Sequence, residues 1–105
     1  MSLTNVLHLY YNMTKIVVRM LVWNEINSEH IKKHAVTQSE VAVAVTHLGY
    51  HKQTYDKRYL LVGRSGKRIL AVVLKREKTN QYYVLTARDA NKKERRRLYE
   101  KDKIK

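Results

Sequence analysis

Apolar residues cluster along the chain in four stretches that are typical of β-strands. Residues 15–23, KIVVRMLVW, and residues 68–75, RILAVVLK, are rich in β-branched side chains. Residues 59–62, YLLV, and residues 81–87, QYYVLTA, combine aromatic and branched side chains. Residues of these types suit a pleated, partly buried surface, so the pattern predicts four strands. Residues 6–11, VLHLYY, are compatible with an added edge strand.

Two segments after the first strand have the apolar spacing of helices. Residues 25–34 predict a short helix that begins at a cap formed by Asn27 or Ser28. Residues 37–40, TQSE, have the form of a capping box, in which the first and fourth residues exchange hydrogen bonds. We therefore expect a second helix over residues 38–48.

Polar stretches predict the connections between the strands. Residues 50–57 are expected to form a polar connection, and residues 76–80 a charged loop. Residues 64–67, RSGK, predict a hairpin turn in which Gly66 takes a positive φ.

The order of these elements is strand, helix, helix, three strands and a last helix. This order predicts an α+β fold, with a small antiparallel sheet of about four strands, two N-terminal helices and one basic C-terminal helix. The simplest arrangement places the helices on one face of the sheet. Residues 1–105 are expected to form a single domain, with residues 1–14 as an N-terminal extension.

The composition is strongly basic and contains no cysteine. Twenty-two Lys and Arg residues against nine Asp and Glu residues give a net charge of +13. This charge predicts a polyanionic partner, which is nucleic acid, an acidic protein or, less favourably, an anionic membrane surface. The apolar segment 6–23 is interrupted by polar and charged residues, so we expect no membrane span and a cytoplasmic protein.

Two arginines follow predicted strands and are candidates for phosphate binding. Arg64 ends the second strand and Arg88 follows the fourth. A guanidinium fork matches a phosphate and stabilises charge that develops on it. The alternative for each residue is a solvated or ion-paired arginine, and the sequence leaves open whether the two lie on the same side of the sheet.

The C-terminal segment predicts a cationic helix. Asn91 and Glu94 have the spacing of a capping box, and Leu98 is the main apolar residue after them. The candidate RNA-binding residues on this helix are Lys92, Lys93, Arg95, Arg97 and Tyr99.

Three residues are candidates for moving a proton, namely Lys33, His34 and Glu94. His34 has an alternative role at a helix end, and Glu94 is already explained by capping. His30 and His34 are four residues apart, which suits a metal, but no third ligand is evident and we predict no metal site.

Taken together, the ordered motifs resemble the BrnT family of bacterial toxins over residues 21–100. The residues that carry the resemblance are Trp23-Asn24, KH-x-V-T-x-x-E from Lys33 to Glu40, Gly63-Arg64, and T-A-R-x-A-x-x-x-E-R-R-x-x-Y from Thr86 to Tyr99. The family residues that match are Lys33, His34, Glu40, Arg64, Arg88, Glu94 and Tyr99. This chain departs from the family in residues 1–14, which are extra, and in Ala35, where many members have glycine.

The resemblance implies a RelE-like fold and a metal-independent endoribonuclease that stops translation without a cofactor. It also implies neutralisation by a BrnA-type antitoxin, in a dimer or a heterotetramer with that antitoxin. Our leading hypothesis is therefore the RNA-cleaving toxin of a type II toxin-antitoxin system. The alternatives are a non-catalytic module that binds nucleic acid, and an inactive relative that binds only an acidic antitoxin.

Overall fold

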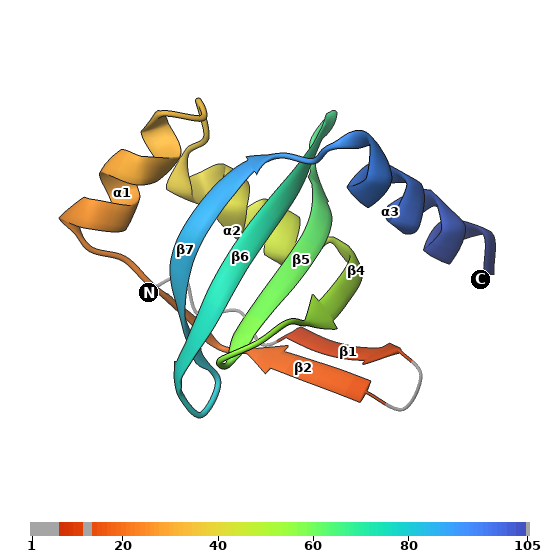
Figure 1. Cartoon of the computed structure of the whole chain (residues 1–105), viewed down its shortest axis with the longest axis horizontal. Helices are drawn as coiled ribbons and strands as arrows, with labels where there is room; N and C mark the ends of the chain where they lie inside the picture. The colour runs from red at the N-terminus through yellow and green to blue at the C-terminus, as the bar shows by residue number, and fades with distance from the viewer. Residues whose placement is uncertain (1–6, 12–13, 105) are drawn as a thin grey trace.

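A five-stranded sheet forms the centre of the computed structural model, which describes residues 7–11 and 14–104 and the side chains of 16–102. Its strand order is β3-β7-β6-β5-β4, and Figure 1 labels the last four of these strands in this order. The strands are β3 (Met20–Val22), β4 (Leu48–Gln53), β5 (Arg58–Ser65), β6 (Arg68–Lys78) and β7 (Gln81–Asp89). Neighbouring strands are antiparallel, except that β3 runs parallel to β7. The α+β class is confirmed, with five strands in this sheet in place of about four.

The chain enters the sheet through a separate hairpin. Strands β1 (Leu7–Tyr11) and β2 (Thr14–Val18) pair with each other, and Ile16 and Val18 of β2 are buried in the main core. The predicted single strand 15–23 is thus divided, because Arg19 and Met20 both donate their backbone N–H to Asn80 O. Residues 1–6 and 12–13 of the predicted extension lie outside the described residues.

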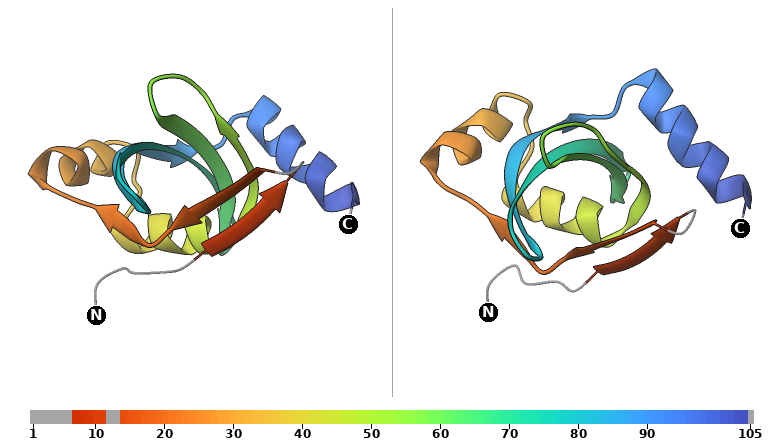
Figure 2. Two further views of the ribbon diagram at one scale, coloured as in Figure 1. Left: turned by 90° about the horizontal axis from the view of Figure 1, so that it is seen from below. Right: turned by 60° about the horizontal axis from the view of Figure 1, so that its bottom comes forward.

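Helix α2 (Gln38–Thr46) covers one face of the sheet, which curls around it (Figure 2). Val41 and Val45 of this helix are buried against Leu61 and Val72 of the central strands. The contact is close, since a Cβ on Gly63 would overlap Ala44 O. Helix α1 (Glu25–Lys32) lies beside β7, near the edge of the sheet opposite to β4.

Helix α3 (Lys92–Ile104) packs on the opposite face of the sheet from α2. Its Leu98 is fully buried with Val62 and Ala71, whose side chains alternate with the α2-facing Leu61 and Val72. The expectation that all helices lie on one face is therefore wrong. The physical reason is that the central strands carry apolar residues on both faces, so each face needs a cover.

Two predicted connections are in fact strands. Residues 50–57 were expected to be a polar connection, but β4 occupies Leu48–Gln53 and pairs with β5. Residues 76–80 were expected to be a loop, but β6 continues to Lys78 before the turn. β4 is an edge strand whose Lys52 and Gln53 remain exposed, so it lacks the apolar pattern of a buried strand.

Helix starts follow the capping rules closely. Thr37 and Glu40 exchange the two hydrogen bonds of a capping box, and Asn91 and Glu94 do the same, as predicted. The cap of α1 is Asn24, so the prediction of Asn27 or Ser28 is wrong. Asn27 instead completes the box from inside the helix, and its buried amide donates to Val22 O and Val84 O. No helix within the described ranges is long and apolar enough to cross a membrane.

The end of α1 places Ala35 in a conformation that favours glycine. Val36 N donates to Ile31 O and Ala35 N donates to Lys32 O, which are the two bonds of a Schellman motif. Ala35 has φ 56°, in the left-handed region, and Ile31 and Val36 are both buried beside it. The Cβ of Ala35 therefore accepts a strain that glycine avoids.

We predict that Ala35→Gly raises the free energy of unfolding by about 1 kcal/mol, because relief of the left-handed strain exceeds the entropy cost of glycine. The matched control is Ala42→Gly in the buried middle of α2, which is expected to destabilise by a similar amount. Denaturant unfolding measures both. A decrease for both variants would contradict the strain at Ala35.

Candidate functional site

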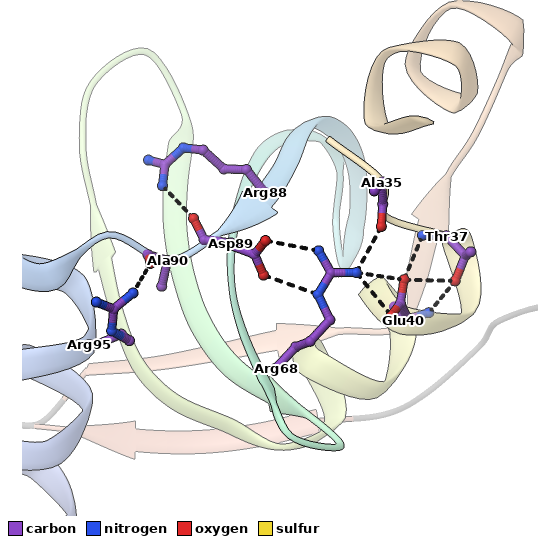
Figure 3. Close-up of polar contacts among 8 residues, drawn as sticks. All are labelled: Ala35, Thr37, Glu40, Arg68, Arg88, Asp89, Ala90 and Arg95. Carbon is purple, nitrogen blue, oxygen red and sulfur yellow. Dashed lines mark hydrogen bonds and ion pairs between the residues drawn. The ribbon is translucent and has the colours of Figure 1, made fainter. Parts of the chain in front are cut away.

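Arg88 and Glu94 form a two-pronged ion pair between the end of β7 and the start of α3. Arg88 Nη1 donates to Glu94 Oε1 at 2.7 Å, and Nη2 donates to Oε2 at 2.9 Å. Nη1 also donates to the backbone oxygen of Asp89 at 3.3 Å (Figure 3). The Glu94 side chain is only 12% exposed, whereas the Arg88 side chain is 35% exposed, so the carboxylate is shielded from water and the guanidinium remains accessible. These bonds fix both the position and the plane of the guanidinium.

The electrostatics of this pair favour a positioning role for Glu94. The hydrogen bond from Arg88 lowers the pKa of Glu94, against the opposing effect of burial, and Glu94 raises the pKa of Arg88 in return. A carboxylate with a lowered pKa is a weak proton acceptor near neutral pH. Glu94 is therefore better suited to hold Arg88 than to receive a proton.

The sheet register places Arg64 on the same face as Arg88. Val62, Ala71 and Arg88 are opposite one another on β5, β6 and β7, and Arg64 is two residues beyond Val62. Side chains two residues apart share a face, so both arginines lie on the face that α3 covers. Strand spacing puts their Cα atoms roughly 12 Å apart.

Arg64 also has a carboxylate partner on α3. Its Nη2 donates to Asp102 at 2.7 Å, with both side chains partly exposed. Glu94, Leu98 and Asp102 are four residues apart, so they form one stripe along the helix. The sheet-facing side of α3 thus has a buried leucine between two carboxylates, each paired with an arginine of the sheet.

The cations of α3 are left on its solvent side. Lys92, Lys93, Arg96 and Arg97 are exposed and line an open hollow of about 480 Å³. Arg95 differs from them, because its guanidinium donates to Ala90 O at 2.6 Å and holds the connection from β7 (Figure 3). Tyr99 is 46% exposed. The helix therefore presents positive charge outward. Arg95 is also exposed, but its hydrogen bond to Ala90 O gives it a structural role as well.

Arg68 joins three parts of the chain, and sequence reasoning did not identify it as a site residue. Its Nε and Nη2 donate to the Asp89 carboxylate at 3.0 and 3.1 Å, while Nη1 donates to Ala35 O at 2.7 Å (Figure 3). The same Nη1 reaches Glu40 at 3.1 Å. Arg68 lowers the pKa of Asp89 through this hydrogen bond. The junction holds the loop after α1 against the end of β7.

Lys33 and His34 are therefore placed at the same end of the sheet as Arg88. Both are exposed, and the ring of His34 meets that of His30 edge-on, with centroids 5.4 Å apart. His30 Nε2 lies 3.1 Å from Thr86 Oγ1, two residues before Arg88 on β7. His30 is a functional candidate that the sequence showed only through its spacing to His34. In the part of the chain that the structure describes, no three His, Asp or Glu residues form a metal site.

Glu94→Gln is predicted to lower the free energy of unfolding at neutral pH. It is also predicted to make that free energy decrease less steeply as the pH is lowered. The folded pKa of Glu94 lies below its ordinary value of 4.5, so the ionised pair stabilises the fold above that pH. This stabilisation is lost as the pH falls through the folded pKa, and glutamine has no such dependence. Urea unfolding between pH 7 and pH 3 measures the effect, with Glu100→Gln on the exposed side of α3 as control. If the free energy of unfolding decreased equally with falling pH for wild type and Glu94→Gln, the stabilising role of the pair would be contradicted.

Comparison with known proteins identifies the fold. No family model matches the chain, and no curated protein matches it. Among solved structures, the chain is similar to the crystal structure of the ribonuclease toxin BrnT of Brucella abortus, at 21% sequence identity and a TM-score of 0.56. The match covers 69% of this chain and 96% of the Brucella chain. The chain therefore has the fold of a BrnT toxin.

Proposed function

We propose that this protein is the toxin of a toxin-antitoxin pair and acts as an endoribonuclease. The observation that carries the proposal is the placement of Arg64 and Arg88 on one face, at one end of a sheet whose fold is shared with a ribonuclease toxin. Arginine forks at fixed strand ends suit the phosphates of RNA.

In the proposed reaction, Arg88 holds the scissile phosphate. A guanidinium has five N–H donors, and the bonds to Glu94 and Asp89 use three of them. The remaining donors are available to a phosphate oxygen without breaking the ion pair. Arg64 uses one donor on Asp102 and serves a neighbouring phosphate. Glu94 keeps the Arg88 guanidinium in its plane.

Proton transfer is assigned to the loop after α1. The 2′-hydroxyl of RNA attacks the adjacent phosphorus and its proton passes to a base, while the bond from phosphorus to the 5′-oxygen of the next nucleotide breaks. The products are a 2′,3′-cyclic phosphate and a 5′-hydroxyl, whose oxygen takes a proton from water. His34 is our first choice for the base, because imidazole is the usual proton carrier near neutral pH, and Lys33 is the second. Lys33 lines a hollow of about 300 Å³ together with His30 and Tyr83. This scheme uses side chains alone and requires no metal or cofactor.

The outward side of α3 is proposed to bind the RNA backbone through Lys92, Lys93 and Arg97, with smaller contributions from Arg95 and Tyr99. A net charge of +13 also suits an acidic, BrnA-type antitoxin that covers the same surface. The toxin-antitoxin assembly is a proposal that rests on the fold.

A second function is favoured by one specific observation. Both arginines are already paired with carboxylates of α3, as arginines with a purely structural role would be. A protein of this kind would bind RNA or an acidic partner through α3 and leave RNA intact. Its binding would weaken with salt, but no cleavage would follow.

Arg88→Ala is predicted to abolish growth arrest and RNA cleavage, by at least about 100-fold, because a donor to the developing phosphate charge is lost. The measurement is induced expression in a bacterium, with and without the neighbouring gene, followed by growth and total RNA integrity. Circular dichroism of the purified variant establishes that it is folded.

The matched control is Arg58→Ala, which removes the same charge from the other end of β5, where Arg58 pairs with Asp56. It is expected to retain toxicity. Full toxicity of a folded Arg88→Ala variant would overturn the assignment. Intact RNA and normal growth with folded wild-type protein would instead favour the binding function.

A further inference from the structure

A small cavity lies between α3 and the β4–β5 edge of the sheet. It has a volume of about 160 Å³ and is lined by Tyr50 and Lys52 of β4, Leu60 of β5, and Lys93 and Arg97 of α3. Tyr50 and Leu60 are partly buried and pack against the buried cluster under α3, which consists of Val62, Ala71, Ala90 and Leu98. The cavity thus has an apolar floor and a rim of three cations.

The cavity shares a wall with the proposed phosphate site. Glu94 also lines it, and both oxygens of that carboxylate are held by Arg88. Leu60 precedes Val62 by two residues, and Val62 lies in the same cross-strand row as Arg88. The floor of the cavity and the Arg88 side chain therefore lie on one face of the sheet, two strands apart and two residues apart along the strands, which places the Cα atoms of Leu60 and Arg88 roughly 12 Å apart.

Size and charge together define the ligand. A volume of 160 Å³ corresponds to roughly five water molecules, which is close to one nucleobase and too small for two. The apolar floor suits a flat ring, and the positive charges of Lys93 and Arg97 in the lining suit the phosphates next to a base. The carboxylate of Glu94 in the cavity wall is neutralised by Arg88, so it does not repel a nearby phosphate.

We propose that this cavity is a subsite for one base of single-stranded RNA next to the scissile phosphate. The inference deepens the proposed ribonuclease function and rests on it. Binding of one base at a fixed distance from Arg88 gives the protein a nucleotide preference at one position beside the cut. Single-stranded RNA is commonly read in this way, with an exposed base against an apolar or aromatic surface.

The test measures binding separately from cleavage. A fluorescein-labelled hexaribonucleotide with 2′-O-methyl groups is not cleavable by 2′-hydroxyl attack, and its affinity follows from fluorescence anisotropy. Leu60→Trp leaves less space in the cavity than one base needs and is expected to weaken binding about tenfold, since the base is excluded from the subsite. Val43→Trp, at an exposed position on α2, is the control for the added indole and is expected to bind normally.

Charge is tested by a second matched pair. Arg97→Ala is expected to weaken binding about threefold to fivefold and to reduce the salt dependence by about one phosphate contact. Arg96→Ala removes the same charge one residue away, outside the cavity lining, and is expected to change affinity less than twofold. A further readout is the base beside the cut in wild-type digests, whose preference is expected to change in Leu60→Trp and to persist in Arg97→Ala.

The outcomes separate this inference from the proposed function. Wild-type protein that binds the oligonucleotide through Leu60 but leaves natural RNA intact sustains the base-binding site, and rejects both the ribonuclease and the position of this site beside a cut. Equal affinities for Leu60→Trp and Val43→Trp overturn the subsite. If an acidic peptide binds wild type and loses affinity in Leu60→Trp while RNA affinity is unchanged, the cavity belongs to a protein partner and the inference is also overturned.

Discussion

The Arg88–Glu94 pair is the interaction on which the arrangement of the candidate site depends. Glu94 caps α3 through Asn91 and at the same time binds the last arginine of β7, so one carboxylate sets both the start and the direction of the helix. Removal of either partner leaves a partly buried charge uncompensated, which costs more than the pair itself contributes. Leu98 then adds the apolar contact, against Gly49, where a Cβ would overlap its side chain.

This pair also explains how a helix with so many cations packs on a basic protein. The inward stripe of α3 contains two carboxylates, and these meet Arg64 and Arg88 of the sheet. Two of the three carboxylates of the helix are paired at the interface, while Lys92, Lys93, Arg96 and Arg97 are left in solvent together with Glu100. The polarity of α3 is therefore a consequence of packing, and it produces a surface that attracts polyanions.

The sequence predicted local features better than relations between distant residues. The capping boxes at Thr37 and Asn91 and the positive φ of Gly66 were predictable, because each depends on a few neighbouring residues. Strand β4 was not predictable, because an edge strand with exposed polar residues lacks the regular alternation of apolar and polar residues. The side of the sheet chosen by α3 and the junction at Arg68 depend on residues 20 to 40 positions apart, which no local pattern encodes. For the same reason Arg64 and Arg88 were expected at strand ends, but their common face required the register.

The geometry of Arg88 differs from that of the cations that only attract a polyanion. A surface that only binds polyanions needs charge at roughly the right place, and exposed lysines and arginines on α3 are sufficient for that. Arg88 has instead a guanidinium plane fixed by two bonds to one carboxylate and a third to the backbone. Fixing the plane costs side-chain entropy, and it benefits a ligand whose oxygens must be met in a defined direction. A phosphate that changes geometry during reaction is such a ligand. In the proposed function, the ion pair that gives Arg88 a structural role is therefore also the feature that orients its guanidinium toward a phosphate.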